Sequence, residues 1–226
     1  MNYGRSFSFM FEDRDWVVKI VLGGVFMLLS CILVGIPFLY GYVLEVIRNV
    51  AEGRDTPLPS WDNLGEKFVQ GLIIVVILII VAIPLILSSC AAGFLNAILA
   101  DTRGDGARAL MLLVVALAWL FFALYTLVYA LFLPAFMIRY AMTRDFGATL
   151  NIRSAWSIIT ANFGNYILVL IVAALASLLG SLGTIACVIG VFLTYFWAYL
   201  LQGHLFGQYY RAFVSPAGGV SPQAAA

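Results

Sequence analysis

A long apolar run, FVQGLIIVVILIIVAIPLILSSCAAGFLNAIL, occupies residues 68–99 and contains no aspartate, glutamate, lysine or arginine. A helix needs about 20 apolar residues to cross the roughly 30 Å of hydrocarbon in a bilayer. The run is therefore long enough to span a membrane with residues to spare. Pro84 lies inside it and predicts a kink, because proline removes one backbone hydrogen bond from a helix.

The composition of the whole chain indicates the same class of protein. Of the 226 residues, 64% are hydrophobic and only 10% are charged, and the mean hydropathy is +1.05. Soluble domains carry about 25% charged residues, so there are too few charges here to cover a water-facing surface. The net charge of +1 provides no basic field for nucleic acid, and we expect no nucleic-acid partner.

No cofactor or metal is expected. The three cysteines, Cys31, Cys90 and Cys187, lie inside apolar runs without C-x-x-C spacing. This pattern indicates neither a zinc site nor a redox motif. The sequence also lacks paired carboxylates, a phosphate-binding loop and an H-E-x-x-H motif, so no catalytic residue can be assigned from it.

Further spans are predicted on both sides of residues 68–99. The run from Val17 to Ile47 is too long for one crossing, and Val34-Gly35-Ile36-Pro37 interrupts it, because proline favours the first turn of a new helix. Pro134 predicts the end of the span that follows Pro84. The spans expected are about 16–34, 37–52, 68–99, 107–133, 166–182 and 188–211. The predicted fold class is an all-α integral membrane protein with six transmembrane helices, in which two short hairpins flank two long central spans.

The positions of lysine and arginine predict the orientation, because cytoplasmic loops carry an excess of both. Six spans place ten of the 12 on one side, and only Arg103 and Arg108 on the other. We therefore expect a protein of the plasma membrane with both termini in the cytoplasm. Residues 1–15 would form a cytoplasmic segment, 16–213 one membrane domain, and 214–226 a disordered tail.

Amphipathic helices on the membrane surface are predicted in two connecting segments. In 148–163, apolar side chains recur at helical spacing, while Arg153 and its polar neighbours face away. The apolar positions are Ile152, Ala155, Trp156, Ile159 and Phe163. A shorter stretch at Trp61, Leu64 and Phe68 begins at Ser60. Both segments could lie on lipid or pack on the ends of the spans, and the sequence leaves these alternatives open.

Few ionisable or strongly polar side chains lie inside the predicted spans, where such a residue is a functional candidate. Glu45 is three residues before Arg48, so the two are neighbours on a helix and are expected to pair. His204 and Gln208 share one face of the last span. A structural role is the alternative for all four residues, because they lie near predicted span ends.

Residues 41–62, GYVLEVIRNVAEGRDTPLPSWD, carry a resemblance to a known family, together with Tyr3-Gly4-Arg5-Ser6-Phe7, Asp15-Trp16 and Lys19-Ile20. They resemble bacterial and archaeal membrane proteins of the domain-of-unknown-function 4013 family. The resemblance extends through Cys187-Val188-Ile189-Gly190 to Gly207-Gln208. It implies a small multi-pass prokaryotic protein, and no activity, substrate or site residues. The second half is also loosely similar to the membrane region of some glycerophosphodiester phosphodiesterases. The similar parts are Pro134, 147–163 and 166–211, and the catalytic part of those enzymes has no counterpart in this sequence.

These observations favour a non-enzymatic membrane protein: a scaffold, accessory or lipid-organising subunit that contacts membrane lipid and forms a homo-oligomer or joins a larger membrane complex. Candidate partner contacts are Arg54, Asp55, Trp61 and Asp62 in the loop after the second span, and Arg153 and Trp156 on the surface helix. The same loop could instead serve only to fold the protein. One alternative function is a small transporter or channel with a polar path near Glu45 and His204. Another is a membrane enzyme acting on lipid.

Overall fold

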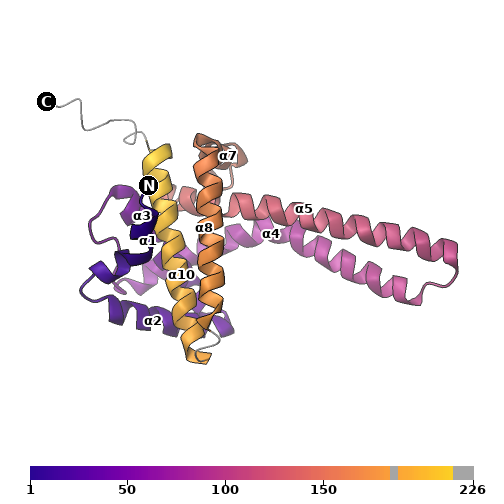
Figure 1. The fold of residues 1–226 in the computed structure, drawn as a ribbon, viewed down its shortest axis with the longest axis horizontal. Coiled ribbons are helices and arrows are strands. Elements are labelled where there is room, and N and C mark those ends of the chain that lie inside the picture. Colours follow the sequence, from indigo (N-terminus) through magenta and orange to yellow (C-terminus); the bar gives the residue numbers. More distant parts are fainter. Residues whose placement is uncertain (184–187, 216–226) are drawn as a thin grey trace. The chain divides into compact units, whose positions relative to one another are not determined.

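The structure is a computed structural model that describes residues 1–183 and 188–215, and all regular secondary structure in these ranges is helical (Figure 1). Two predictions touch residues outside these ranges: most of the tail 214–226, and the interruption between the last two spans. The order is α1 (Tyr3–Ser8), η1 (Phe9–Glu12), α2 (Trp16–Leu29), η2 (Ser30–Ile32), α3 (Gly35–Glu52), α4 (Leu64–Asp101), α5 (Asp105–Thr143), α6 (Phe146–Thr149), α7 (Ile152–Ala161), α8 (Phe163–Ser181), α10 (Val188–Tyr209) and η3 (Tyr210–Val214).

The chain divides into two compact units, of which the first contains residues 1–76 and 134–226. Within it α10 lies alongside α8 and also packs on α3 and α2 (Figure 1). A cluster of buried residues in this unit joins Phe9 and Met10 to Tyr42 of α3 and to Phe196 and Leu200 of α10. The N-terminal segment is thus part of this core.

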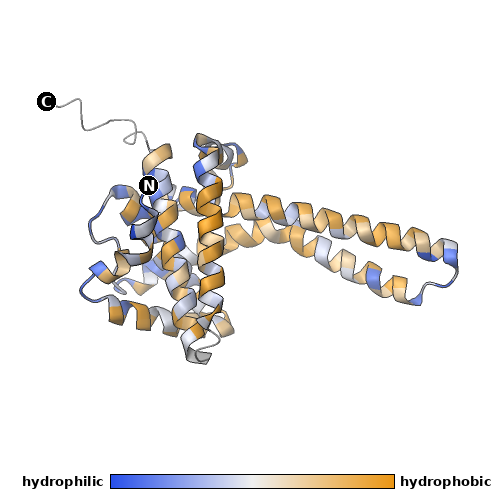
Figure 2. Ribbon diagram, viewed as in Figure 1, coloured by the Kyte–Doolittle hydropathy of each residue, from blue (hydrophilic) through white to orange (hydrophobic). Residues whose placement is uncertain are grey.

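The second unit, residues 77–133, is a hairpin made by the end of α4 and the start of α5. Its surface is apolar along most of its length (Figure 2). Large side chains such as Phe94, Leu110 and Leu127 are more than 60% exposed. The Tyr125 hydroxyl donates a hydrogen bond to the Val81 carbonyl at 2.8 Å and links the two helices. Apolar residues on all sides are typical of helices that lie in lipid or against other membrane helices.

Among the described residues, three helices are long and apolar enough to cross a membrane: α4, α5 and α8. The N-terminal helices α1–η1 and α2–η2 meet the same test only as a pair, which is bent by 102°. Among the other predicted spans, α3 carries Glu45 and Arg48, and α10 carries His204 and Gln208, which lowers their apolar character. The structure therefore supports a membrane protein of helices, and six spans remain a prediction.

The predicted break after Val34 is confirmed. Leu33 adopts a left-handed conformation with φ of 66°, and α3 begins at Gly35. Pro37 lies in the first turn of α3, where backbone N–H groups make no hydrogen bond within the helix, so a proline costs no such bond there. Two other predicted boundaries are wrong. Pro134 does not end its helix, because α5 continues through it to Thr143. No separate surface helix begins at Ser60, since α4 starts only at Leu64 and runs on without interruption.

The predicted surface helix at 148–163 forms as α7, Ile152–Ala161, and its apolar residues divide into two sets. Ala155, Ile158 and Ile159 are buried in the first unit. Ile152, Trp156 and Phe163 are 66%, 49% and 53% exposed. The segment therefore packs on the protein by one edge and presents a second apolar edge outward, and contact of that edge with lipid stays a prediction.

Candidate functional site

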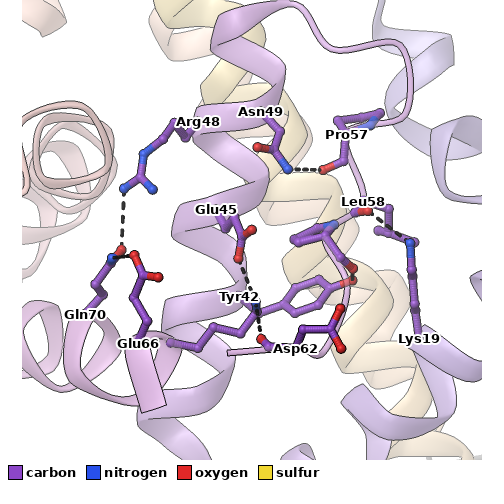
Figure 3. Close-up of polar contacts among 12 residues, drawn as sticks. Lys19, Tyr42, Glu45, Arg48, Asn49, Pro57, Leu58, Asp62, Glu66 and Gln70 are labelled. Atoms are coloured by element: carbon purple, nitrogen blue, oxygen red, sulfur yellow. Dashed lines mark hydrogen bonds and ion pairs between the residues drawn. The ribbon is translucent and has the colours of Figure 1, made fainter. Parts of the chain in front are cut away.

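The segment between α3 and α4, residues 53–63, is held by side chains that bind its backbone carbonyl groups (Figure 3). The Tyr42 hydroxyl donates to the Pro59 carbonyl at 2.7 Å, and the Asn49 amide donates to the Pro57 carbonyl at 3.0 Å. The Lys19 ammonium donates to the Leu58 carbonyl at 3.1 Å. These residues come from α2 and α3, so the loop fixes the two helices to each other.

The same loop begins at Gly53, which adopts a left-handed conformation with φ of 79° and ends α3. Its N–H donates to the Val50 carbonyl, and the N–H of Arg54 donates to the Asn49 carbonyl, both at 3.0 Å. A residue with a Cβ atom adopts this conformation only at a cost, which explains glycine at this helix end.

Trp61, a predicted partner contact, is only partly exposed and belongs to an aromatic cluster. Its indole N–H donates to the Lys19 carbonyl at 2.9 Å, and its ring stacks on Tyr42 and Phe26 with centroids 4.3 and 4.6 Å away. These contacts make it part of the packing of α2 and α3. Whether its remaining exposed surface meets a partner stays a prediction.

The other predicted partner contacts have exposed side chains. Arg54 pairs with Glu52 at 2.8 Å, and Asp55 lies at the surface next to it. Asp62 is also exposed, although its backbone carbonyl accepts a hydrogen bond from Lys67 at 3.0 Å. Arg153 is exposed on α7, beside Trp156. The structure thus places the predicted contacts in two separate segments, the loop and α7.

The expected pairing of Glu45 with Arg48 is wrong, because Lys67 of α4 takes the carboxylate. The ammonium of Lys67 lies 2.8 Å from Glu45, with side-chain exposures of 6% and 34%. Arg48 turns the other way, and its Nε donates to the Ala141 carbonyl at 2.9 Å. A contact between helices therefore replaces the expected contact within one helix.

The charges continue as a chain across α3, α4 and the end of α5 (Figure 3 shows its part on α3 and α4). Arg48 donates to Gln70 at 3.4 Å, and Gln70 donates to Glu66 at 2.7 Å. Glu66 in turn pairs with Arg144 at 2.8 Å. Gln70 thus links the Arg48 guanidinium to the Glu66 carboxylate, and these contacts join the three helices.

A close crossing of α3 and α4 makes this arrangement possible. A Cβ atom on Gly71 would overlap the Pro37 carbonyl, and one on Gly41 would overlap the Lys67 carbonyl. Small residues let two helix backbones approach closely in membranes. The crossing brings the first turns of α4 against α3 and so places Lys67 beside Glu45.

His204 and Gln208 hold the N-terminal segment against α10. The Ser6 hydroxyl lies 2.9 Å from His204 Nδ1, and the Phe9 ring stacks on the imidazole with centroids 4.2 Å apart. Gln208 accepts from the Asn2 backbone N–H at 2.9 Å and donates to the Asn2 carbonyl at 3.1 Å. Glu45 and His204 thus have separate partners, and the contacts do not join them in one polar path.

The polar side chains of this region take part in hydrogen bonds and ion pairs. Within this part of the chain, no three histidine, cysteine, aspartate or glutamate side chains converge as metal ligands do. Every buried side-chain nitrogen and oxygen found there has a hydrogen-bond partner. The roles of Tyr42, Asn49 and Lys67 were missed by the sequence reasoning. The spacing of seven between Tyr42 and Asn49, which places both on one face of α3, was a signal for the first two.

The fold and these contacts define the class: a helical protein whose described part contains three helices able to cross a membrane, and whose polar side chains join helices. The sequence matches, over residues 24–194, the family described as proteins of unknown function DUF4013, and the chain belongs to this family. No curated protein and no solved structure matches the chain. The looser likeness to glycerophosphodiester phosphodiesterases finds no support in these comparisons.

Proposed function

We propose that the protein is a non-enzymatic scaffold or accessory subunit of the plasma membrane, organised as six spans with both termini in the cytoplasm. The observation that carries this proposal is that the polar residues of the first unit connect one helix to another. The Glu45–Lys67 pair, the charges from Arg48 to Arg144 and the carbonyls of residues 53–63 are all engaged in joining helices. Such an arrangement favours a rigid body over a site that exchanges protons or substrates.

The hairpin of residues 77–133 supports the assembly role within this proposal. It adds a second body with apolar residues on all sides, suited to contact with lipid or with helices of another subunit. We propose that it contributes the interface of a homo-oligomer or of a larger membrane complex. The proposed lipid contacts surround the same helices.

Photocrosslinking in the native membrane tests the assembly role. A photoactivatable amino acid replaces Phe94, Leu110 or Leu127 in turn, all of which are strongly exposed, and the buried Ile138 serves as the control position. The proposal predicts a protein adduct of discrete mass from at least one hairpin position and none from Ile138. Adducts with lipid alone at all three positions would contradict assembly through the hairpin.

The transport alternative makes a different prediction. A path that uses Glu45 or His204 requires a solute or ion flux in proteoliposomes that falls in Glu45→Ala or His204→Ala. The scaffold proposal predicts no flux above that of protein-free vesicles. A lipid-acting enzyme would instead convert a member of a lipid panel, which the proposal does not expect.

A further inference from the structure

A hollow of about 470 Å³ lies in the first unit, where three segments distant in sequence meet. They are the N-terminal residues, the end of α3 with the loop after it, and the end of α10 with η3. The lining residues are Met1, Asn2, Arg5, Val50, Gly53, Arg54, Asp55, Pro57, His204, Gln208, Arg211 and Ala212. Pockets of roughly 300–1,000 Å³ are the usual size for small ligands.

The charges in the lining favour an anion. Each of the three segments contributes one arginine, Arg5, Arg54 and Arg211, and Asp55 is the one carboxylate among the lining residues. All three arginines are exposed side chains. Glu12 and Glu52 offset part of the charge of Arg5 and Arg54, while an anion in the hollow would be attracted by all three guanidinium groups.

Arg211 has no hydrogen-bond or ion-pair partner among the described residues. Its guanidinium lies against the backbone of Gly53, 2.7 Å from the position that a Cβ atom would occupy there. Glycine at this position therefore leaves room for the guanidinium as well as ending α3. No described residue takes up the N–H donors of this guanidinium, and a ligand in the hollow can bind them.

The other two arginines keep donors free as well. Arg5 uses one terminal nitrogen for Glu12 at 3.1 Å and for the Asp55 carbonyl at 3.2 Å. Arg54 binds Glu52 through Nε and one terminal nitrogen. A guanidinium has five N–H donors, so each side chain can bind a further oxygen.

The walls of the hollow are held in place before any ligand arrives. Gln208 makes two hydrogen bonds to the backbone of Asn2, and His204 contacts Ser6, so the N-terminal segment is fixed to α10. Asn49 fixes the loop through the Pro57 carbonyl. A preformed site loses less conformational entropy when a ligand binds.

From this geometry we infer that the hollow binds a phosphate group, carried by the headgroup of an anionic phospholipid or by a soluble phosphate compound. Planar guanidinium groups match the oxygens of phosphate and bind them through paired hydrogen bonds. The hollow also lies at the ends of α3 and α10 on the predicted cytoplasmic side, where basic pockets between helices meet lipid headgroups. The inference goes beyond the scaffold role, because a single unassembled copy would bind the anion.

The test uses the full-length protein in mild detergent and native mass spectrometry. Phosphatidylglycerol and phosphatidylcholine are titrated separately, and thermal stability is measured with and without inorganic phosphate. The variants are Arg211→Gln and Arg54→Gln. The control is Arg14→Gln, which removes the same charge from an exposed arginine outside the hollow.

The expected result is one retained phosphatidylglycerol, held about fivefold more weakly in each hollow variant and unchanged in the control. Circular dichroism shows whether each variant is folded, and Arg54→Gln keeps the test valid if Arg211→Gln unfolds. Stabilisation by inorganic phosphate with the same variant pattern, and no lipid preference, would assign the site to soluble phosphate compounds. Equal weakening in Arg14→Gln, or no binding of either probe, would overturn the inference.

Discussion

Replacing Gly71 with alanine should separate α3 from α4. The added Cβ atom would overlap the Pro37 carbonyl oxygen and lie 2.7 Å from the Gly41 backbone nitrogen. Both are backbone atoms, which cannot turn aside as a flexible side chain would. Overfilling a packed interface costs about 1–3 kcal/mol, and contact with backbone places this change near the upper end. For a chain of this length, about 3 kcal/mol corresponds to a fall in Tm of roughly 6–12 °C.

Gly65→Ala is the matched control on the same helix. Nothing lies within 4 Å of the position of its Cβ atom, and alanine favours a helix over glycine by roughly 0.5–1 kcal/mol. The control should therefore keep or slightly raise the Tm. Thermal unfolding in lipid nanodiscs, followed by intrinsic tryptophan fluorescence, measures both variants. Equal melting temperatures for the two would refute the close crossing of α3 and α4.

Three further predictions follow from the contacts of the first unit and from the topology. Lys67→Met should lower the free energy of unfolding by about 1–3 kcal/mol, because it leaves the Glu45 carboxylate without its partner. In a double-mutant cycle, adding Glu45→Gln should recover part of this loss. Tyr42→Phe should cost about 0.5–1.5 kcal/mol and increase proteolysis of the loop 53–63, since one held carbonyl is released; an unchanged cleavage rate would count against that role. Cysteines introduced at Asp105 and Ser215 should react with an impermeant reagent from opposite sides of the membrane, and labelling of both from one side would exclude six spans.

The sequence predicted the class of fold because that depends on local patterns. Long apolar runs define α4, α5 and α8 whatever they pack against. The break before α3 was also readable, because Gly35 and Pro37 act on their own backbone. The prediction at Pro134 was wrong, because α5 continues through this residue. A membrane helix tolerates a proline where neighbouring groups form hydrogen bonds with the backbone carbonyl that the proline leaves free.

The site depended on contacts between distant residues, and there the sequence was less informative. Glu45 and Arg48 are close on one helix, yet the Glu45 carboxylate pairs with Lys67. The reason is that α3 and α4 cross closely at Gly41 and Gly71, which places Lys67 beside Glu45. The hollow could not be predicted from the sequence either, since Arg5, Arg54 and Arg211 belong to three segments that are distant along the chain. Single arginines near span ends are ordinary, and only the fold shows that these three surround one space.

The proposal that this protein is an assembly subunit is tested most directly by native mass spectrometry of the protein released gently from its own membrane. The measurement reports the number of copies and any co-purifying protein together. We predict a closed homo-oligomer or a stoichiometric complex with another membrane protein. A bare monomer at every detergent concentration would contradict the scaffold role.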